Sequence, residues 1–281
     1  MKQAARAARA GSRVIGLVPT MGALHEGHLS LIRAAKQQCS PVVVSIFVNP
    51  TQFGPGEDFE KYPRHWESDR GLLESLAVDY LFAPTPAEIY PKGFRTHVEV
   101  EGLSDRLEGR VRPGHFRGVA TVVLKLLEIV QPHFAYFGRK DAQQACILQR
   151  MAVDLDLDSS VMICPIVREP DGLAMSSRNA YLNPEERRSA TVLYCALDSV
   201  RQEIENGERD SMHLIARAHA MLASESAASV DYAELVDSKT LEPVMRLHGS
   251  CLFLLAVRIG KTRLIDNALI VEIDGNFRIS L

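Results

Sequence analysis

The chain has 281 residues, a formal net charge of −3 and a hydrophobic content of 46%, which is typical of a globular protein with one large or two ordinary domains. The charge excludes a broad basic surface for nucleic acid, and no apolar run reaches membrane-spanning length, so neither partner is expected. Five scattered cysteines without a Cys-x-x-Cys pair indicate reduced thiols and a cytoplasmic location. The acid-free, Arg-rich residues 1–13 are a little like a transit peptide, but a strand predicted from about Arg13 leaves little to cleave.

The first half of the chain alternates predicted strands and helices. Apolar, β-branched runs predict strands at 14–18, 41–48, 79–83, 134–137 and 161–167, and helical spacing predicts helices at 27–38, 66–77, 118–130 and 140–155. This alternation predicts an α/β fold with a Rossmann-like, doubly wound parallel sheet over residues 1–167. In such sheets, ligands bind beyond the carboxyl ends of the strands, where the strand order switches.

The pattern changes after about Arg168. A turn-rich segment precedes helices predicted at 184–206 and 211–224, and strands follow near 230–236, 252–259 and 262–265. Helices followed by strands predict a second, smaller α+β domain over residues 168–281.

The segment after the first predicted strand, PTMGALHEGHLSLI at 19–32, places His25 and His28 three residues apart at the start of a helix. A strand, a glycine-bearing turn and a helix N-terminus can cradle phosphate, because backbone N–H groups and the helix dipole point at the anion. Two imidazoles add donors that can follow charge developing on a phosphate, which suggests attack on a nucleoside triphosphate. The alternatives are half of a zinc site, although no Cys or Glu cluster is nearby, or a satisfied surface histidine.

Polar side chains also follow other predicted strands. Gln52 could bind a hydroxyl and a carboxylate at once, or could stabilise a turn. Lys140 offers a positive charge for a triphosphate, and Asp141 could accept from a ribose hydroxyl or cap the next helix. Gln144 lies one helical turn beyond Asp141 and faces the same way.

Further candidates lie in loops. The MSSR segment at 175–178 could clamp phosphate, because Arg binds phosphate oxygens bidentately. The basic loop RPGHFRG, which begins at Arg112, is either an anion gate or an ordinary solvated loop. Glu67 and Asp69, with Asp58 nearby, could supply oxygens to Mg²⁺, although solvation at the surface is the default for such acids.

Six motifs, taken in this order, resemble the pantothenate synthetase (pantoate–β-alanine ligase) family of the nucleotidyltransferase superfamily with the HxGH motif. They are PTMGALHEGH, SIFVNPTQF, YPR, RPGHFRGV, FGRKDAQQ and DGLAMSSRNAYL, and the resemblance runs from about Val14 to the end of the chain. It implies a ligase that uses ATP, with Mg²⁺, to join (R)-pantoate and β-alanine through a pantoyl adenylate. Pantothenate, AMP and pyrophosphate would be the products, and the enzyme would be a homodimer.

The resemblance also implies a nucleotide site. His28 would be the general acid or proton donor, and His25, Lys140 and Arg178 would complete the catalytic set. The ATP site would comprise Met21, Gly22, Ala23, Leu24, His25, Glu26, Gly27, His28, Gly138, Arg139, Lys140, Asp141, Val167, Met175, Ser176, Ser177 and Arg178.

The same resemblance implies substrate and metal contacts. Gln52 and Gln144 would hold pantoate, Gln52 would also meet β-alanine, and Arg112 would belong to the substrate site. Asp69 resembles the family's Mg²⁺-associated acid. A mobile loop over residues 53–62 could exclude water from the adenylate, which is prone to hydrolysis.

The chain departs from the family pattern in places. The family usually has a strand before the first helix, whereas this chain opens on that helix, through a late start site or the loss of an edge strand. Arg139 and the His65-Trp66 pair stand where other residues are common. The competing functions are another adenylyltransferase of the same fold and a non-catalytic nucleotide-binding module.

Overall fold

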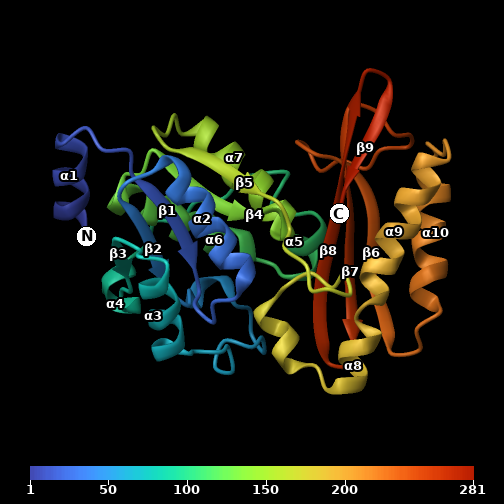
Figure 1. The fold of residues 1–281 in the computed structure, drawn as a ribbon, viewed down its shortest axis with the longest axis horizontal. Coiled ribbons are helices and arrows are strands. Elements are labelled where there is room, and N and C mark those ends of the chain that lie inside the picture. The colour runs from blue at the N-terminus through green and yellow to red at the C-terminus, as the bar shows by residue number, and fades with distance from the viewer. The chain divides into compact units, whose positions relative to one another are not determined.

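The computed structural model describes residues 1–281 and divides them into two compact units, Met1–Pro165 and Ile166–Leu281 (Figure 1). The division falls slightly before the predicted boundary after Val167. Because the two units are separately compact, each is described by itself.

The first unit is built on a parallel sheet. Its strands are β1 (Gly16–Thr20), β2 (Val42–Ile46), β3 (Tyr80–Phe82), β4 (Phe134–Gly138) and β5 (Ser160–Cys164). They lie in the order β3-β2-β1-β4-β5, and every neighbouring pair is parallel. The chain extends from central β1 through β2 and β3 to one edge and then through β4 and β5 to the other. The predicted doubly wound sheet is therefore confirmed, and its strand order switches between β1 and β4.

Helices flank this sheet (Figure 1). They are α1 (Lys2–Ala10), α2 (Glu26–Gln38), α3 (Trp66–Ser75), α4 (Pro86–Ile89), α5 (Leu107–Val111), α6 (His115–Val130) and α7 (Ala142–Asp154). Side chains of α2 and α3, including Ile32 and Leu73, share one buried cluster with Val18, Val44 and Tyr136 of the strands. Because the sheet is covered, its central strands read in the sequence as continuous apolar runs. No helix of the chain combines the length and the hydrophobicity that a membrane span requires.

The second unit packs helices against an antiparallel sheet. Its helices are α8 (Pro184–Ser189), α9 (Val192–Glu205) and α10 (Ser211–Ala223), and its strands are β6 (Ala228–Asp237), β7 (Ser250–Ile259), β8 (Thr262–Ile273) and β9 (Asn276–Ser280), in the order β6-β7-β8-β9. Leu193, Leu197 and Leu214 of the helices and Phe253 and Leu255 of the sheet lie in one buried cluster. The predicted α+β domain is thus present. The single helix predicted over 184–206 is two helices, and β9 was not predicted.

A close backbone contact positions the segment after β2. This segment is a 3₁₀ turn at Pro50–Gln52, and α6 packs directly on it. A Cβ atom on Gly118 of α6 would lie 2.4 Å from the carbonyl oxygen of Thr51 and 2.7 Å from the amide nitrogen of Gln52. Only a glycine lets the helix approach the turn this closely.

Gly118→Ala should therefore destabilise the protein by about 1–3 kcal/mol, the usual cost of overpacking. Gly71 of α3 is the matched control, because an added Cβ there meets nothing within 4 Å. Gly71→Ala should stabilise by about 0.5–1 kcal/mol through helix propensity. Urea unfolding of both variants measures the difference, and a Gly118→Ala variant as stable as the parent would contradict the close packing.

Candidate active site

The predicted nucleotide segments meet where the strand order switches. Residues 21–28 follow β1, and Gly138–Asp141 follow the neighbouring strand β4. Lys140 and Asp141 lie near enough to the two imidazoles for their charges to act on the pKa values of both His25 and His28. The structure thus brings these four predicted residues together.

His25 and His28 cap α2 reciprocally. The Nδ1 atom of His25 accepts the backbone N–H of Gly27 at 3.2 Å, and the Nδ1 atom of His28 accepts the backbone N–H of His25 at 3.3 Å. Their ring centroids are 4.2 Å apart. A capping box normally uses Ser or Thr with Glu, whereas here two imidazoles make both bonds. Because each Nδ1 is an acceptor, the hydrogen bonds assign the proton of each neutral ring to Nε2.

Both rings are neutral at physiological pH. Burial lowers the pKa of His25 to about 4, the charge of Lys140 adds to this, and Asp141 opposes it. Burial lowers the pKa of His28 to about 3, helped by His25 and Lys140 and opposed by Asp141. In the free protein, each ring therefore presents an uncharged Nε2–H donor rather than an imidazolium acid.

The backbone amides of the turn before α2 are used within the protein. The N–H of Gly22 donates to Oγ1 of Thr20 at 3.2 Å, and those of Ala23 and Leu24 donate to the two carboxylate oxygens of Asp69 at 2.9 and 2.8 Å. These three amides thus have partners in the free protein, and the phosphate cradle predicted for residues 21–28 stays a prediction.

Asp69 braces this turn from α3. Its side chain is only 2% exposed, and each of its oxygens accepts one backbone N–H. Gly22 has a φ of +81°, and an added Cβ would lie 3.0 Å from Oδ2 of Asp69, so both the conformation and the contact favour glycine there. Asp69 was predicted as a Mg²⁺-associated acid, and that role stays a prediction.

The residues present do not form a Mg²⁺ site of their own. Nowhere do three or more His, Cys, Asp or Glu side chains gather so that they could hold a metal ion. Proteins usually hold Mg²⁺ with one or two carboxylates together with substrate phosphates. Asp69 is buried, and each of its carboxylate oxygens is already engaged by a backbone amide.

Glu26 and Arg139, two further predicted ATP contacts, have different surroundings. The carboxylate of Glu26 pairs with Arg33 on the exposed surface of α2. Arg139 is 8% exposed, so its side chain lies largely in the interior. Their roles as ATP contacts stay predictions.

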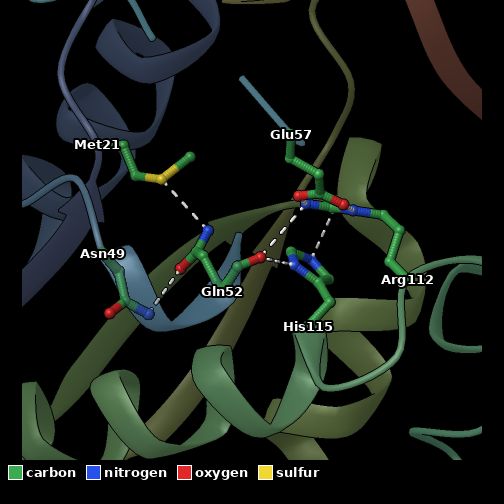
Figure 2. Close-up of polar contacts among 6 residues, drawn as sticks. All are labelled: Met21, Asn49, Gln52, Glu57, Arg112 and His115. Atoms are coloured by element: carbon green, nitrogen blue, oxygen red, sulfur yellow. Dashed lines mark hydrogen bonds and ion pairs between the residues drawn. The ribbon is translucent and has the colours of Figure 1, made fainter. Parts of the chain in front are cut away.

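Gln52 is held at three points (Figure 2). Its Oε1 accepts from Nδ2 of Asn49 at 3.0 Å, its Nε2 donates to the sulfur of Met21 at 3.2 Å, and its backbone oxygen contacts Nδ1 of His115 at 2.8 Å. Asn49 is oriented in turn by Tyr90, whose hydroxyl donates to its Oδ1 at 2.8 Å. Since Met21 belongs to the predicted ATP turn, the predicted nucleotide and substrate sites adjoin.

Arg112 is engaged by a carboxylate of the chain itself. Its Nε and Nη2 donate to Oε1 and Oε2 of Glu57 at 2.7 and 2.6 Å, with the two side chains 15% and 24% exposed. Although burial raises the pKa of Glu57, its hydrogen bonds to Arg112 and the Arg112 charge outweigh this and lower it. The sequence did not indicate Glu57, because nothing in the local pattern links it to Arg112, and it indicated His115 only as a member of the basic loop that begins at Arg112.

The two neighbouring glutamines of α7, Gln143 and Gln144, differ in burial and in their hydrogen bonds. Gln143 is buried, accepts from the N–H of Glu108 at 3.0 Å and donates to the carbonyls of Leu103 and Arg106 at 2.8 and 2.9 Å, so it anchors the loop before α5. Gln144 is partly exposed, as a substrate contact requires. The structure thus distinguishes two residues that the sequence places side by side.

The predicted phosphate clamp of the second unit has its own local order. The N–H of Met175 donates to the carbonyl of Val167 at 3.0 Å. The hydroxyl of Ser176 accepts the N–H of Arg178 at 3.2 Å and so caps the 3₁₀ turn Ser177–Tyr181. This hydroxyl has a structural task in addition to any contact with phosphate.

A buried ion pair anchors the same segment to β8. Arg168 donates to both oxygens of Asp266 at 2.7 and 2.9 Å and to the carbonyl of Gly172 at 2.9 Å. The two side chains are 12% and 1% exposed. This pair has no signature in the sequence, because its members are far apart in the chain.

A doubly wound parallel sheet with polar residues at the switch in strand order is the arrangement in which many α/β proteins bind nucleotides. The family model described as pantoate-beta-alanine ligase matches residues 1–269. A pantothenate synthetase of Acidobacterium capsulatum is 57% identical over 269 residues, which are 96% of this chain and 90% of that protein. The chain belongs to the pantoate–β-alanine ligase family.

Solved structures agree with this membership. The crystal structure of pantothenate synthetase from Thermus thermophilus superposes with a TM-score of 0.89 at 46% identity, over 94% of this chain and 96% of that one. A pantoate-β-alanine ligase from Francisella tularensis, complexed with β-γ ATP and β-alanine, gives a TM-score of 0.76 at 38% identity, over 95% and 94% of the two chains.

Asp69→Asn should loosen the turn before α2, because an amide offers one acceptor oxygen where the carboxylate offers two. We expect a loss of about 1–3 kcal/mol in the free energy of unfolding and weaker ATP binding. The Mg²⁺ concentration for half-maximal activity should be unchanged. Urea unfolding and a Mg²⁺ titration measure these quantities.

Glu74→Gln at an exposed position of the same helix is the matched control and should match the parent in both measurements. A raised Mg²⁺ requirement in Asp69→Asn with unchanged stability would assign Asp69 to the metal rather than to the turn.

Proposed function

We propose that this chain condenses (R)-pantoate with β-alanine in an ATP-dependent reaction that passes through a pantoyl adenylate. The observation that carries the proposal is that Nε2 of Gln52 donates to the sulfur of Met21, the first residue of the predicted ATP turn, while the charge of Lys140 acts on both His25 and His28. Residues predicted to bind the nucleotide and the substrate thus follow the neighbouring strands β1, β2 and β4. The family membership and the ATP and β-alanine bound by the Francisella relative support the same reaction.

The first step joins two anions. An oxygen of the pantoate carboxylate attacks the α-phosphorus of ATP, the bond from that phosphorus to the bridging oxygen breaks, and pyrophosphate leaves. No protein nucleophile is needed, so the protein has to align the reactants and stabilise the charge of the transition state. Lys140 and the two neutral imidazoles are positioned to donate to phosphate oxygens as that charge shifts.

The second step consumes the adenylate. The neutral amine of β-alanine attacks the acyl carbon, a proton leaves the nitrogen, and AMP departs with the bridging oxygen. Gln52 and Gln144 hold pantoate in this proposal, because an amide can both donate to its carboxylate and bind its hydroxyl. A side-chain amide suits a small hydroxy acid better than a phosphorylated acceptor, which would need further basic residues.

The remaining assignments rest on the motifs. Val167 and residues 175–178 join the ATP site in the proposal, with Arg178 binding phosphate oxygens. Mg²⁺ would enter bound to the triphosphate, because the chain offers no acidic cluster for it. A homodimer follows from the family resemblance, and a cytoplasmic location from the five free cysteines.

His28→Ala and Lys140→Ala should each slow adenylate formation by about 10²-fold or more, because each removes a positioned donor. ATP affinity should fall much less. The measurement is the exchange of labelled pyrophosphate into ATP with pantoate and Mg²⁺ and without β-alanine. His28→Gln is the informative partner variant, since its amide can place an N–H where Nε2 stood, and it should retain more exchange than His28→Asn.

The parent enzyme must show this exchange and must release AMP and pyrophosphate with pantothenate. Release of ADP and phosphate, or exchange that strictly requires β-alanine, would refute the adenylate. Near-parental exchange in either alanine variant would remove that residue from the catalytic set.

A further inference from the structure

The turn that carries Gln52 is weakly held by its own backbone. Its two 3₁₀ hydrogen bonds, from the N–H of Gln52 to Asn49 and from the N–H of Phe53 to Pro50, are both 3.4 Å long. Such bonds are at the limit of useful length, so they restrain the turn little. Its position therefore depends on groups from elsewhere in the chain.

His115 makes a short contact with this turn, and Arg112 makes a longer one with the same atom (Figure 2). Nδ1 of His115, the first residue of α6, lies 2.8 Å from the backbone oxygen of Gln52, and Nη2 of Arg112 donates to the same oxygen at 3.4 Å. Gly114, which precedes α6 with a φ of +82°, lets the chain turn so that both side chains face that carbonyl.

The proton of His115 is placed by Arg112. Nη1 of Arg112 lies 3.2 Å from Nε2 of His115, and a guanidinium can only donate, so Nε2 is the acceptor. The ring proton is then on Nδ1, which donates to the carbonyl of Gln52. Burial lowers the pKa of His115 to about 4, and the Arg112 charge adds to this, so the ring is neutral. Its tautomer is opposite to that of His25 and His28.

Arg112 has little capacity left for a substrate. Its Nε and Nη2 are bonded to Glu57, its Nη1 to His115 and its Nη2 also to the carbonyl of Gln52. A substrate carboxylate would have to displace Glu57, which is half-buried against it. The guanidinium of Arg112 thus uses most of its donors to bind other groups of the protein.

We propose that His115 and Arg112 are positioning residues that fix the backbone of Gln52, so that its side-chain amide meets pantoate in one place. Arg112 acts through Gln52 and His115 and does not touch substrate, and Glu57 holds the guanidinium in line. This inference rests on the proposed function, since it assumes that Gln52 binds pantoate.

The test uses pantoate-dependent exchange of pyrophosphate into ATP without β-alanine. His115→Leu removes the donor, and His115→Gln moves it toward the position of Nε2. Both should raise the pantoate concentration for half-maximal exchange by about tenfold, within the range of a lost hydrogen bond to a buried carbonyl. His115→Asn keeps an N–H near the position of Nδ1 and should restore most of the affinity. The ATP requirement should change by less than about twofold in all three.

His219→Leu, at an exposed position of α10 in the second unit, is the control for the loss of an imidazole. If His115→Leu does not fold, the comparison of the Gln and Asn variants decides. The positioning role would be overturned if His115→Gln and His115→Asn had equal pantoate requirements. It would also be overturned if the ATP requirement rose as much as the pantoate requirement.

Arg112→Gln separates positioning from direct contact. If Arg112 acts through Gln52, this variant raises the pantoate concentration for half-maximal exchange, a reaction from which β-alanine is absent. If exchange is unchanged and only the β-alanine requirement of the full reaction rises, Arg112 binds that substrate and the inference fails. Absence of exchange in the parent enzyme would instead refute the proposed function, so the two failures are distinguishable.

Discussion

The paired hydrogen bonds between the imidazoles of His25 and His28 and the first backbone amides of α2 are the constraint on which the proposed site depends. They satisfy N–H groups that a helix start leaves without partners. By occupying both Nδ1 atoms, they also leave each neutral ring with its proton on Nε2. In the proposed function, the same two hydrogen bonds therefore cap the helix and orient the Nε2–H donors toward the triphosphate, so replacing either ring changes both.

Side chains also hold the backbone of other loops beyond the parallel sheet. These loops make few backbone hydrogen bonds of their own, so side chains from neighbouring elements satisfy them. Asp69 of α3 holds the amides of Ala23 and Leu24, and His115 of α6 holds the carbonyl of Gln52. Charged and polar groups that could be mistaken for ligand contacts act here on the backbone. In the proposed function, the imidazole Nε2–H donors, Lys140 and the glutamine amides bind the substrates, and the amide of Gln52 is also held by Asn49 and Met21.

The sequence was sufficient for much of the architecture and for the chemistry-bearing motifs. The five parallel strands follow from continuous apolar runs, and His25, His28, Lys140 and Asp141 meet because their segments follow adjacent strands at the switch in strand order. Family resemblance supplied the substrates, which no local pattern could.

What the sequence could not give are contacts between residues distant in the chain. A carboxylate at position 69 is equally compatible with a metal ion and with two amides, and only the fold shows that the amides use it. The pairing of Arg112 with Glu57 and of Arg168 with Asp266 has no local signature. Strand β9 was missed because its alternating polar residues at a sheet edge give little apolar signal.

The hydrogen bonds of His25 and His28 require neutral imidazoles with their protons on Nε2. Long-range ¹H–¹⁵N correlation spectra of the histidine-labelled free protein test this tautomer directly, with each ring assigned from its own variant. We expect the neutral Nε2–H tautomer for both rings at pH 7, persisting as the pH falls to about 5, since the pKa values are about 4 and about 3. A proton on Nδ1 of either ring, or protonation of either ring near pH 6.5, would contradict it.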